Sequence, residues 1–322
     1  MESIESLFSA IDFSHPVAIL VVAISLDRVI GDPRPLHLVA LFGRWAGFLE
    51  KRLIGPDDLP AKARRWRGNT AVQMALIFPL VLILLPMGSD LWPLLAPVLL
   101  FYTIASRSLA DHADAISRAL DAGDLEQARK QLAMIVSRDT DELTEQEITA
   151  ATVESILENG ADGIYGALFW YAIAGIPGAV IYRMVNTLDA MWGYRTPRYN
   201  EFGRAAARLD DLLNWPVSLL TCGTYILIGN ASTALHAFRH KPRWKSPNAG
   251  RVMATGAGAL ECLLGGSSIY QGKRVERPTL GVGIPPGKET IARAIDLVET
   301  GLWIWFIALS GILLLVHDWL LA

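Results

Sequence analysis

The chain has 322 residues, of which 52% are hydrophobic and 19% charged, and its mean hydropathy is +0.33. It is too apolar for an ordinary soluble domain, yet it carries too many charges for a protein embedded throughout in lipid. A formal net charge of −3, with no basic stripe among aromatic residues, gives no nucleic-acid signature. Cys222 and Cys262 are the only cysteines and lie in apolar surroundings, which predicts neither a disulfide framework nor a zinc site.

Four segments are apolar enough to cross a bilayer, which takes roughly 20 residues. These predicted spans are about 14–31, 70–88, 91–108 and 301–319. Segments 163–184 and 212–229 contain glycine or proline, which favours two broken or re-entrant helices. Basic residues gather in the loop 32–69, so this loop is expected to face the cytoplasm and the N-terminus the outside. If both ambiguous segments only dip into the membrane, the arginine-bearing loop between them is cytoplasmic too.

Helix signals fill the polar parts of the chain. Residues 109–137 predict two amphipathic helices hinged at 121–124, with an aspartate capping the second. Thr144 and Glu147 have the spacing of a capping box at the start of the next helix. Another helix is expected over 200–213, and strand signals are sparse. The predicted class is all-α: one polytopic, membrane-embedded helical bundle over residues 1–322, with cytoplasmic helical segments.

The next helix carries a row of acidic residues next to an apolar run. Glu154, Glu158 and Asp162 are four residues apart, so they share one helix face, with Asn159 beside them. Like charges in one row repel unless a cation or basic side chains neutralise them. Mg²⁺ takes such oxygen ligands and usually bridges to a phosphate. A solvated acidic face is the structural alternative.

A polar cluster follows the first apolar segment. Asp27 lies inside that segment, where a charged residue is costly and is usually functional. An interfacial pair with Arg28 is the alternative explanation. Asp32 and His37 follow within ten residues, and each could act as a base, although spacing does not rank them.

Two further clusters combine oxygen acceptors with arginines or small residues. The first contains Asn186, Asp189, Arg204, Arg208, Asp210, Asp211 and Asn214. Guanidinium groups hold phosphate or carboxylate in pairs of hydrogen bonds, although these arginines could equally form ion pairs along one helix. The second contains Ser246 and Asn248, where a helix start could bind an anion or simply form a packing turn. The standard nucleotide-loop, zincin and serine-hydrolase motifs are absent from the sequence.

The motifs occur in an ordered series along the chain. They read LDRVIGDPRPLH at 26–37, ALDAGDLEQARKQLAMIVSRDT at 119–140, VESILENGADG at 153–163, PGAVIYRMVNTLDAMWGY at 177–194, YNEFGRAAARLDDLLN at 199–214, SPNAG at 246–250 and LGG through ERPTLG at 264–281. Together they resemble the CobD/CbiB family of cobalamin biosynthesis, the adenosylcobinamide-phosphate synthases. The chain departs from the family pattern at Leu38, at Val217 and Ser218, and over 269–273, which bears on substrate preference.

The resemblance implies a ligase of the inner membrane with its active site on the cytoplasmic side. It would join adenosylcobyric acid to aminopropanol phosphate through an amide bond, using ATP and Mg²⁺, with the lipid bilayer and other enzymes of cobalamin assembly as partners. Two other readings are an intramembrane prenyltransferase-like enzyme, which needs more spans, and a non-catalytic AmpE-type sensor or transporter-like relative.

Under this resemblance the motif residues take expected roles. Mg²⁺ and phosphate are expected at Glu154, Glu158, Asn159, Asp162 and Asp189, with Glu154 and Asp162 also in the catalytic set beside Asp27, Asp32 and His37. Substrate binding is expected at Asn186, Arg204, Arg208, Asp210, Asp211, Asn214, Ser246 and Asn248, with Arg138 as a weaker candidate.

Overall fold

The computed structural model describes residues 15–33, 37–56, 58–270 and 272–321, and it is mostly helical, at 72%. The chain separates into two compact units. Among the described residues, the first unit takes those up to 105, those from 166 to 213 and those from 306 onward. The second unit takes residues 106–165 and 214–305.

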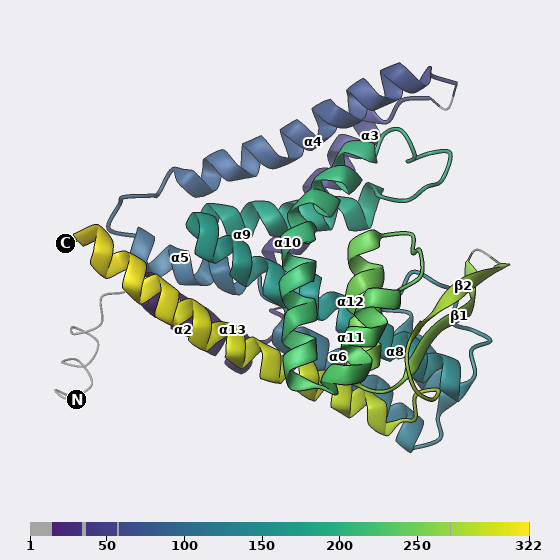
Figure 1. Cartoon of the computed structure of the whole chain (residues 1–322). Coiled ribbons are helices and arrows are strands. Elements are labelled where there is room, and N and C mark those ends of the chain that lie inside the picture. Colours follow the sequence, from purple (N-terminus) through teal and green to yellow (C-terminus); the bar gives the residue numbers. More distant parts are fainter. Residues whose placement is uncertain (1–14, 34–36, 57, 271, 322) are drawn as a thin grey trace. The chain divides into compact units, whose positions relative to one another are not determined.

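The first unit is built around helix α9 (Gly166–Trp192), which packs against three other helices (Figure 1). These are α3 (Leu38–Leu53), α4 (Ala61–Leu84) and α5 (Trp92–Phe101). Helix α2 (Pro16–Ile30) packs on α5. The first turns of α4 are basic, and its later turns expose apolar side chains such as Ile77, Phe78, Val81 and Leu82. An exposed apolar face of this kind is typical of contact with lipid or another apolar partner.

Helix α9 is interrupted halfway along. Ala174 (φ −137°, ψ 19°) and Gly175 (φ 62°, ψ −153°) leave the helical conformation, and Pro177 follows two residues later. Glycine adopts a positive φ at no steric cost, and proline cannot donate the helical hydrogen bond. The predicted break in segment 163–184 is therefore present in the structure.

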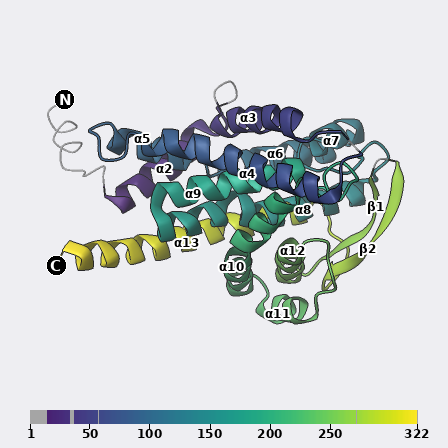
Figure 2. The same ribbon diagram turned by 90° about the horizontal axis from the view of Figure 1, so that it is seen from above.

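The second unit is built around helix α8 (Glu145–Gly160), whose side chains are buried on nearly every face. It packs against α6 (Ser106–Asp121), α7 (Leu125–Leu132) and α12 (Pro247–Ala259), while α11 (Ala231–His240) lies beside α12 (Figure 2). A π-helical turn, η1 (Ala161–Tyr165), follows α8. Helices α10 (Arg204–Ile228) and α13 (Glu289–Leu321) each begin in one unit and end in the other.

The local helix signals of the sequence are confirmed. The side chain of Asp124 caps α7 by accepting a hydrogen bond from the backbone N–H of Gln127. Thr144 and Glu147 form the reciprocal capping box at the start of α8. Each such cap stabilises a helix end by about 1 kcal/mol.

The expectation of an all-α chain needs correction. Strands β1 (Leu263–Tyr270) and β2 (Lys273–Gly281) form an antiparallel hairpin, with a bulge between Leu264 and Gly266 (Figure 1). The hairpin packs on α8 and α12. Its inward residues, such as Leu280, are buried, whereas most of β2 is exposed and polar. Four of the nine residues of β2 are charged and one is Pro278, so the strand lacks the apolar alternation that usually marks a strand in a sequence.

Four helical stretches in the described part of the chain are long and apolar enough to cross a membrane, judged by length and composition. They are Ala61–Leu84, Trp92–Asp121, Glu145–Trp192 and Glu289–His317. Three overlap the predicted spans at 70–88, 91–108 and 301–319, and the fourth overlaps 163–184. The predicted span 14–31 corresponds to α2, whose 15 residues fall short of the roughly 20 needed. Segment 212–229 lies almost entirely in α10, which remains helical at Pro216. A re-entrant course through the membrane, for this segment or for 163–184, stays a prediction.

Candidate functional site

Helix α8 carries Glu154 into the interior of the second unit, where the residue is 2% exposed. Arg277 of β2 meets its carboxylate with two hydrogen bonds, at 2.9 Å between Nη1 and Oε2 and 3.0 Å between Nη2 and Oε1. Arg138 donates a further hydrogen bond to Oε2, and the backbone N–H of Gly265 donates to Oε1 at 2.8 Å. The carboxylate therefore accepts four hydrogen bonds, two on each oxygen, which fills its ordinary acceptor capacity.

We call Arg138, Glu154 and Arg277 the buried charge cluster. Each arginine side chain is only 12% exposed, and Cζ of Arg277 also lies 5.3 Å from the ring centre of Trp244. Buried charges are costly unless they are paired and fully hydrogen-bonded, as these are. The cluster joins α8 to the hairpin, so Glu154 acts in this geometry as an anchor and does not fit a Mg²⁺ ligand.

The rest of the acidic row lies beyond this cluster. Glu158 is half-buried and Asn159 is exposed, and the Asn159 amide donates to the Ser155 carbonyl and hydroxyl at 2.9 and 3.1 Å. Asp162 lies in the π-helical turn, which winds more slowly than an α-helix, so it departs from the straight four-residue row. Among the described residues, no group of three or more His, Cys, Asp or Glu side chains has the arrangement of a metal site.

The polar cluster that follows the first apolar segment, with Asp27, Asp32 and His37, lies in the first unit. His37 caps α3, and its Nδ1 accepts a hydrogen bond from the backbone N–H of Val39 at 3.2 Å. Its Nε2 lies 3.8 Å from Oδ1 of Asp32. Burial lowers the pKa of His37 below its ordinary 6.5; Asp32 opposes that shift and Arg183 adds to it. Because Nδ1 is an acceptor, the neutral ring carries its proton on Nε2, toward Asp32. Asp27 is 3% exposed.

The Asn186 cluster, apart from Asn214, is also in the first unit. The side-chain amide of Asn186 on α9 donates to Oδ1 of Asp210 on α10 at 3.4 Å. Arg204 lies 4.0 Å from the carboxylate of Glu201, whereas Arg208 and Asp211 are exposed on α10 and Asp189 is half-buried on α9. The structure thus brings two of the predicted residues into direct contact.

The Ser246 cluster is in the second unit and has clear local contacts. Ser246 caps α12 by accepting from the backbone N–H of Ala249 at 3.4 Å. Asn248 accepts a hydrogen bond from the Ser218 hydroxyl at 3.2 Å, and Arg251 donates to the same hydroxyl at 3.3 Å. The predicted helix start near Asn248 is therefore present.

The predicted site residues fall in both units. The first unit holds Asp27, Asp32, His37, Asn186, Asp189, Arg204, Arg208, Asp210 and Asp211, and the second holds Glu154, Glu158, Asn159, Asp162, Asn214, Ser246 and Asn248. Their convergence on a single hollow stays a prediction.

Sequence reasoning missed several ionic contacts. Arg277 lies in the ERPTLG motif, yet it received no role because its partner is 123 residues away. Glu50 accepts hydrogen bonds from Arg198 at 3.0 Å and from the Tyr199 hydroxyl at 2.8 Å, and Arg65 pairs with Glu201. Burial, together with the Glu50 hydrogen bond, raises the pKa of Tyr199. The available signal for the Arg65 pair was the group of basic residues in segment 32–69, which had served only to predict topology.

By fold and composition, this is a mostly helical protein with membrane-length apolar helices and a buried charge cluster that joins α8 to a β-hairpin. The family model for the CobD/Cbib protein matches residues 20–298. The chain therefore belongs to the CobD/CbiB family.

Curated relatives match over nearly the whole chain. The cobalamin biosynthesis protein CobD of Chromobacterium violaceum is 46% identical over 291 residues, which cover 89% of this chain and 93% of the relative. The protein of the same name from Stutzerimonas stutzeri is 45% identical, with 89% and 94% covered. That from Clostridium perfringens is 34% identical, with 81% and 86% covered. No solved structure matches the chain.

Proposed function

We propose that this chain is the amide-forming ligase of cobalamin biosynthesis that joins adenosylcobyric acid to aminopropanol phosphate. The observation that carries the proposal is the match to relatives named for cobalamin biosynthesis along 89% of the chain. The acidic and arginine-bearing motifs lie within that match, which runs through residues 20–298 in the family model.

The reaction needs an activated carboxyl group, because an oxygen of a free carboxylate is a poor leaving group. In the proposed sequence, a propionate carboxylate oxygen attacks the terminal phosphorus of ATP and ADP leaves. The amine nitrogen then attacks the acyl carbon, the amide C–N bond forms, phosphate departs, and the amine loses a proton to a base. Positioning and charge stabilisation are the main tasks of the protein in such a reaction.

Asp32 is the base that the contacts favour. Both ring nitrogens of His37 are engaged, Nδ1 with a backbone N–H and Nε2 toward Asp32. The Asp32 side chain is 30% exposed, so an amine can reach it, whereas Asp27 is buried. His37 then acts as a positioning residue for Asp32.

The phosphate-holding groups of the proposal are Arg204 and Arg208, since a guanidinium offers paired donors to phosphate. Asn186 and Asp210, which are hydrogen-bonded to each other, would orient a polar group of the substrate. The remaining substrate contacts are assigned to Asp211, Asn214, Ser246 and Asn248.

Mg²⁺ would enter with ATP and neutralise its phosphates. It commonly uses only one or two protein carboxylates and completes its shell with phosphate oxygens and water. We propose that Asp162 and Asp189 serve as such ligands, with Glu158 and Asn159 near Asp162 in the sequence. Glu154 does not, because both of its oxygens are saturated by donors.

An assay with the purified full chain tests the function. Adenosylcobyric acid, aminopropanol phosphate and Mg-ATP should yield the amide product together with equal amounts of ADP and phosphate. Asp32→Asn and Asp162→Asn should lower turnover at least about a hundredfold, in line with the loss of a general base or a metal contact. Exposed Glu142→Gln is the matched control and should behave as wild type.

A chain that binds adenosylcobyric acid but forms no amide under any nucleotide would contradict the ligase and favour the AmpE-type sensor. The cytoplasmic location of the site and contacts with other enzymes of the pathway belong to the same proposal. Full activity of Asp162→Asn would remove the acidic row from the mechanism.

A further inference from the structure

The first unit contains a pocket of about 590 Å³ between α3, α4, α5 and α9. The volume lies within the usual range for small-molecule sites, roughly 300–1,000 Å³. Most of its wall is apolar, with contributions from Phe42, Phe78, Leu82 and Leu99. None of the residues assigned above to the ligase reaction lines it.

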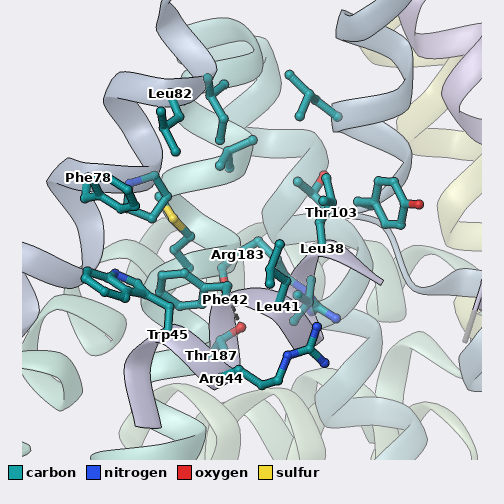
Figure 3. Close-up of a pocket in the computed structure, with 17 residues that line it drawn as sticks. Leu38, Leu41, Phe42, Arg44, Trp45, Phe78, Leu82, Thr103, Arg183 and Thr187 are labelled. Carbon is teal, nitrogen blue, oxygen red and sulfur yellow. Dashed lines mark hydrogen bonds between the residues drawn. The ribbon is translucent and has the colours of Figure 1, made fainter. Parts of the chain in front are cut away.

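The charged side chains that line the pocket are those of two arginines. Figure 3 shows Arg44 and Thr187 at one end and Leu82 at the other, with Arg183 between them. Arg44 is exposed on α3, and Thr187 uses its hydroxyl to donate to the carbonyl of Arg183 at 2.8 Å. The described residues that line the pocket include these two arginines and no carboxylate. The pocket is therefore cationic near these two side chains and uncharged along the rest of its lining.

Three of the four lining helices belong to stretches that can cross a membrane, namely those of α4, α5 and α9. The later turns of α4 expose Ile77, Val81 and Leu82, so one wall of the pocket is the same helix whose outer side suits contact with lipid. A ligand of this pocket must be apolar along most of its length and anionic at one end.

We infer that this pocket binds one phospholipid with an anionic head group. One acyl chain would lie along Phe42, Phe78 and Leu82, and the phosphate would accept hydrogen bonds from Arg44 and Arg183. Guanidinium groups bind phosphate through paired, charge-assisted hydrogen bonds, whereas an uncharged apolar groove would not distinguish one head group from another. The residues of this inference have no assigned role in the ligase proposal, although Arg183 lies close enough to His37 to lower its pKa.

Native mass spectrometry of the full chain in mild detergent tests the inference. The probes are phosphatidylglycerol and phosphatidylcholine with identical acyl chains. Wild-type protein should retain phosphatidylglycerol about tenfold more than phosphatidylcholine, because the choline cation of the second lipid would be repelled by the guanidinium groups of Arg44 and Arg183, a difference of about 1.4 kcal/mol. Arg44→Gln should abolish this preference. Arg52→Gln is the matched control, since Arg52 lies on the same helix, stacks over Phe48 and is outside the pocket.

A second pair of variants tests the apolar wall without removing charge. Leu82→Trp should reduce binding of both lipids by filling the pocket. Leu85 is 73% exposed and lies outside the pocket, so Leu85→Trp should leave the binding of both lipids unchanged. Equal retention of the two lipids by wild type, or an unchanged preference in Arg44→Gln, would overturn the inference. Displacement of bound phosphatidylglycerol by adenosylcobyric acid would also overturn it, by assigning the pocket to the substrate.

Discussion

Glu154 shows how one buried side chain can organise a region. Its carboxylate lies between two arginines from segments more than a hundred residues apart, Arg138 and Arg277. Each partner compensates for the desolvation of the others, and the backbone N–H of Gly265 completes the arrangement. The consequence is a hairpin tied to α8 by charged hydrogen bonds as well as by packing.

Removing the negative charge of Glu154 should therefore destabilise the folded protein. Glu154→Gln leaves two guanidinium groups buried without a counter-charge, and we expect it to lower the free energy of unfolding by about 3–5 kcal/mol. Thermal and denaturant unfolding in detergent measure this loss, with exposed Glu142→Gln as the control. Equal stability of the two variants would show that the charge cluster is not a structural anchor.

His37 gives a pH-dependent prediction. Its pKa is lowered in the folded state, so the unfolded chain binds the proton more readily. Stability should be unaffected above about pH 6.5, the ordinary value, and should fall as the pH drops below it. His37→Asn keeps an acceptor for the α3 cap but does not titrate, so the difference in Tm between wild type and variant should change between pH 7.5 and 5.5. A constant difference would argue against a buried neutral imidazole.

At the level of elements, glycines mark where a helix approaches other backbone. A Cβ at Gly68 on α4 would lie 2.0 Å from the carbonyl oxygen of Phe202, whereas a Cβ at Gly223 on α10 would meet nothing within 4 Å. The first position therefore fixes how closely α4 approaches the segment before α10. The second has no such constraint.

Alanine at these two positions should have opposite effects. Gly68→Ala must displace backbone and should destabilise the protein by about 1–3 kcal/mol. Gly223→Ala should stabilise it by about 0.5–1 kcal/mol, since alanine is the better helix former. Unfolding temperatures of the two variants and the wild type in the same detergent measure both changes in stability. Similar effects from the two substitutions would contradict the close approach at Phe202.

The elements predicted correctly are those whose signals are local. Asp124 and Thr144 cap the helices that follow them, and both patterns are complete within four residues. The hairpin was missed because β2 is exposed and rich in charge, so its pairing with β1 has no clear period-two pattern. The partner of Glu154 was missed for a different reason, since nothing near position 154 points to Arg277. Such long-range pairs depend on the fold as a whole.

For the whole molecule, the distribution of charge over the loops predicts the membrane topology. Positively charged loops favour the cytoplasmic side, which predicts that Arg195 faces the cytoplasm and Ser89 the outside. The two native cysteines, Cys222 and Cys262, are buried, and burial raises the pKa of Cys262 to about 12. Both features should keep their background labelling low.

Labelling of introduced cysteines tests this topology. Arg195→Cys should react with a membrane-impermeant maleimide in inside-out vesicles and not in intact spheroplasts, and Ser89→Cys should do the reverse. The native chain, labelled in parallel, is the control for background. Labelling of Arg195→Cys from the outer face would mean that both ambiguous segments cross the membrane fully.

The interruption at Ala174 and Gly175 has a consequence for the residues beyond it. A continuous helix would transmit the rotation set by its first half to every side chain in the second, including Arg183 and Asn186. A residue with φ of 62° uncouples the two halves, so the orientation of the later side chains is decided by their own neighbours. Any residue other than glycine at position 175 would be strained at this positive φ, so glycine there is what allows the two halves of α9 to be oriented separately.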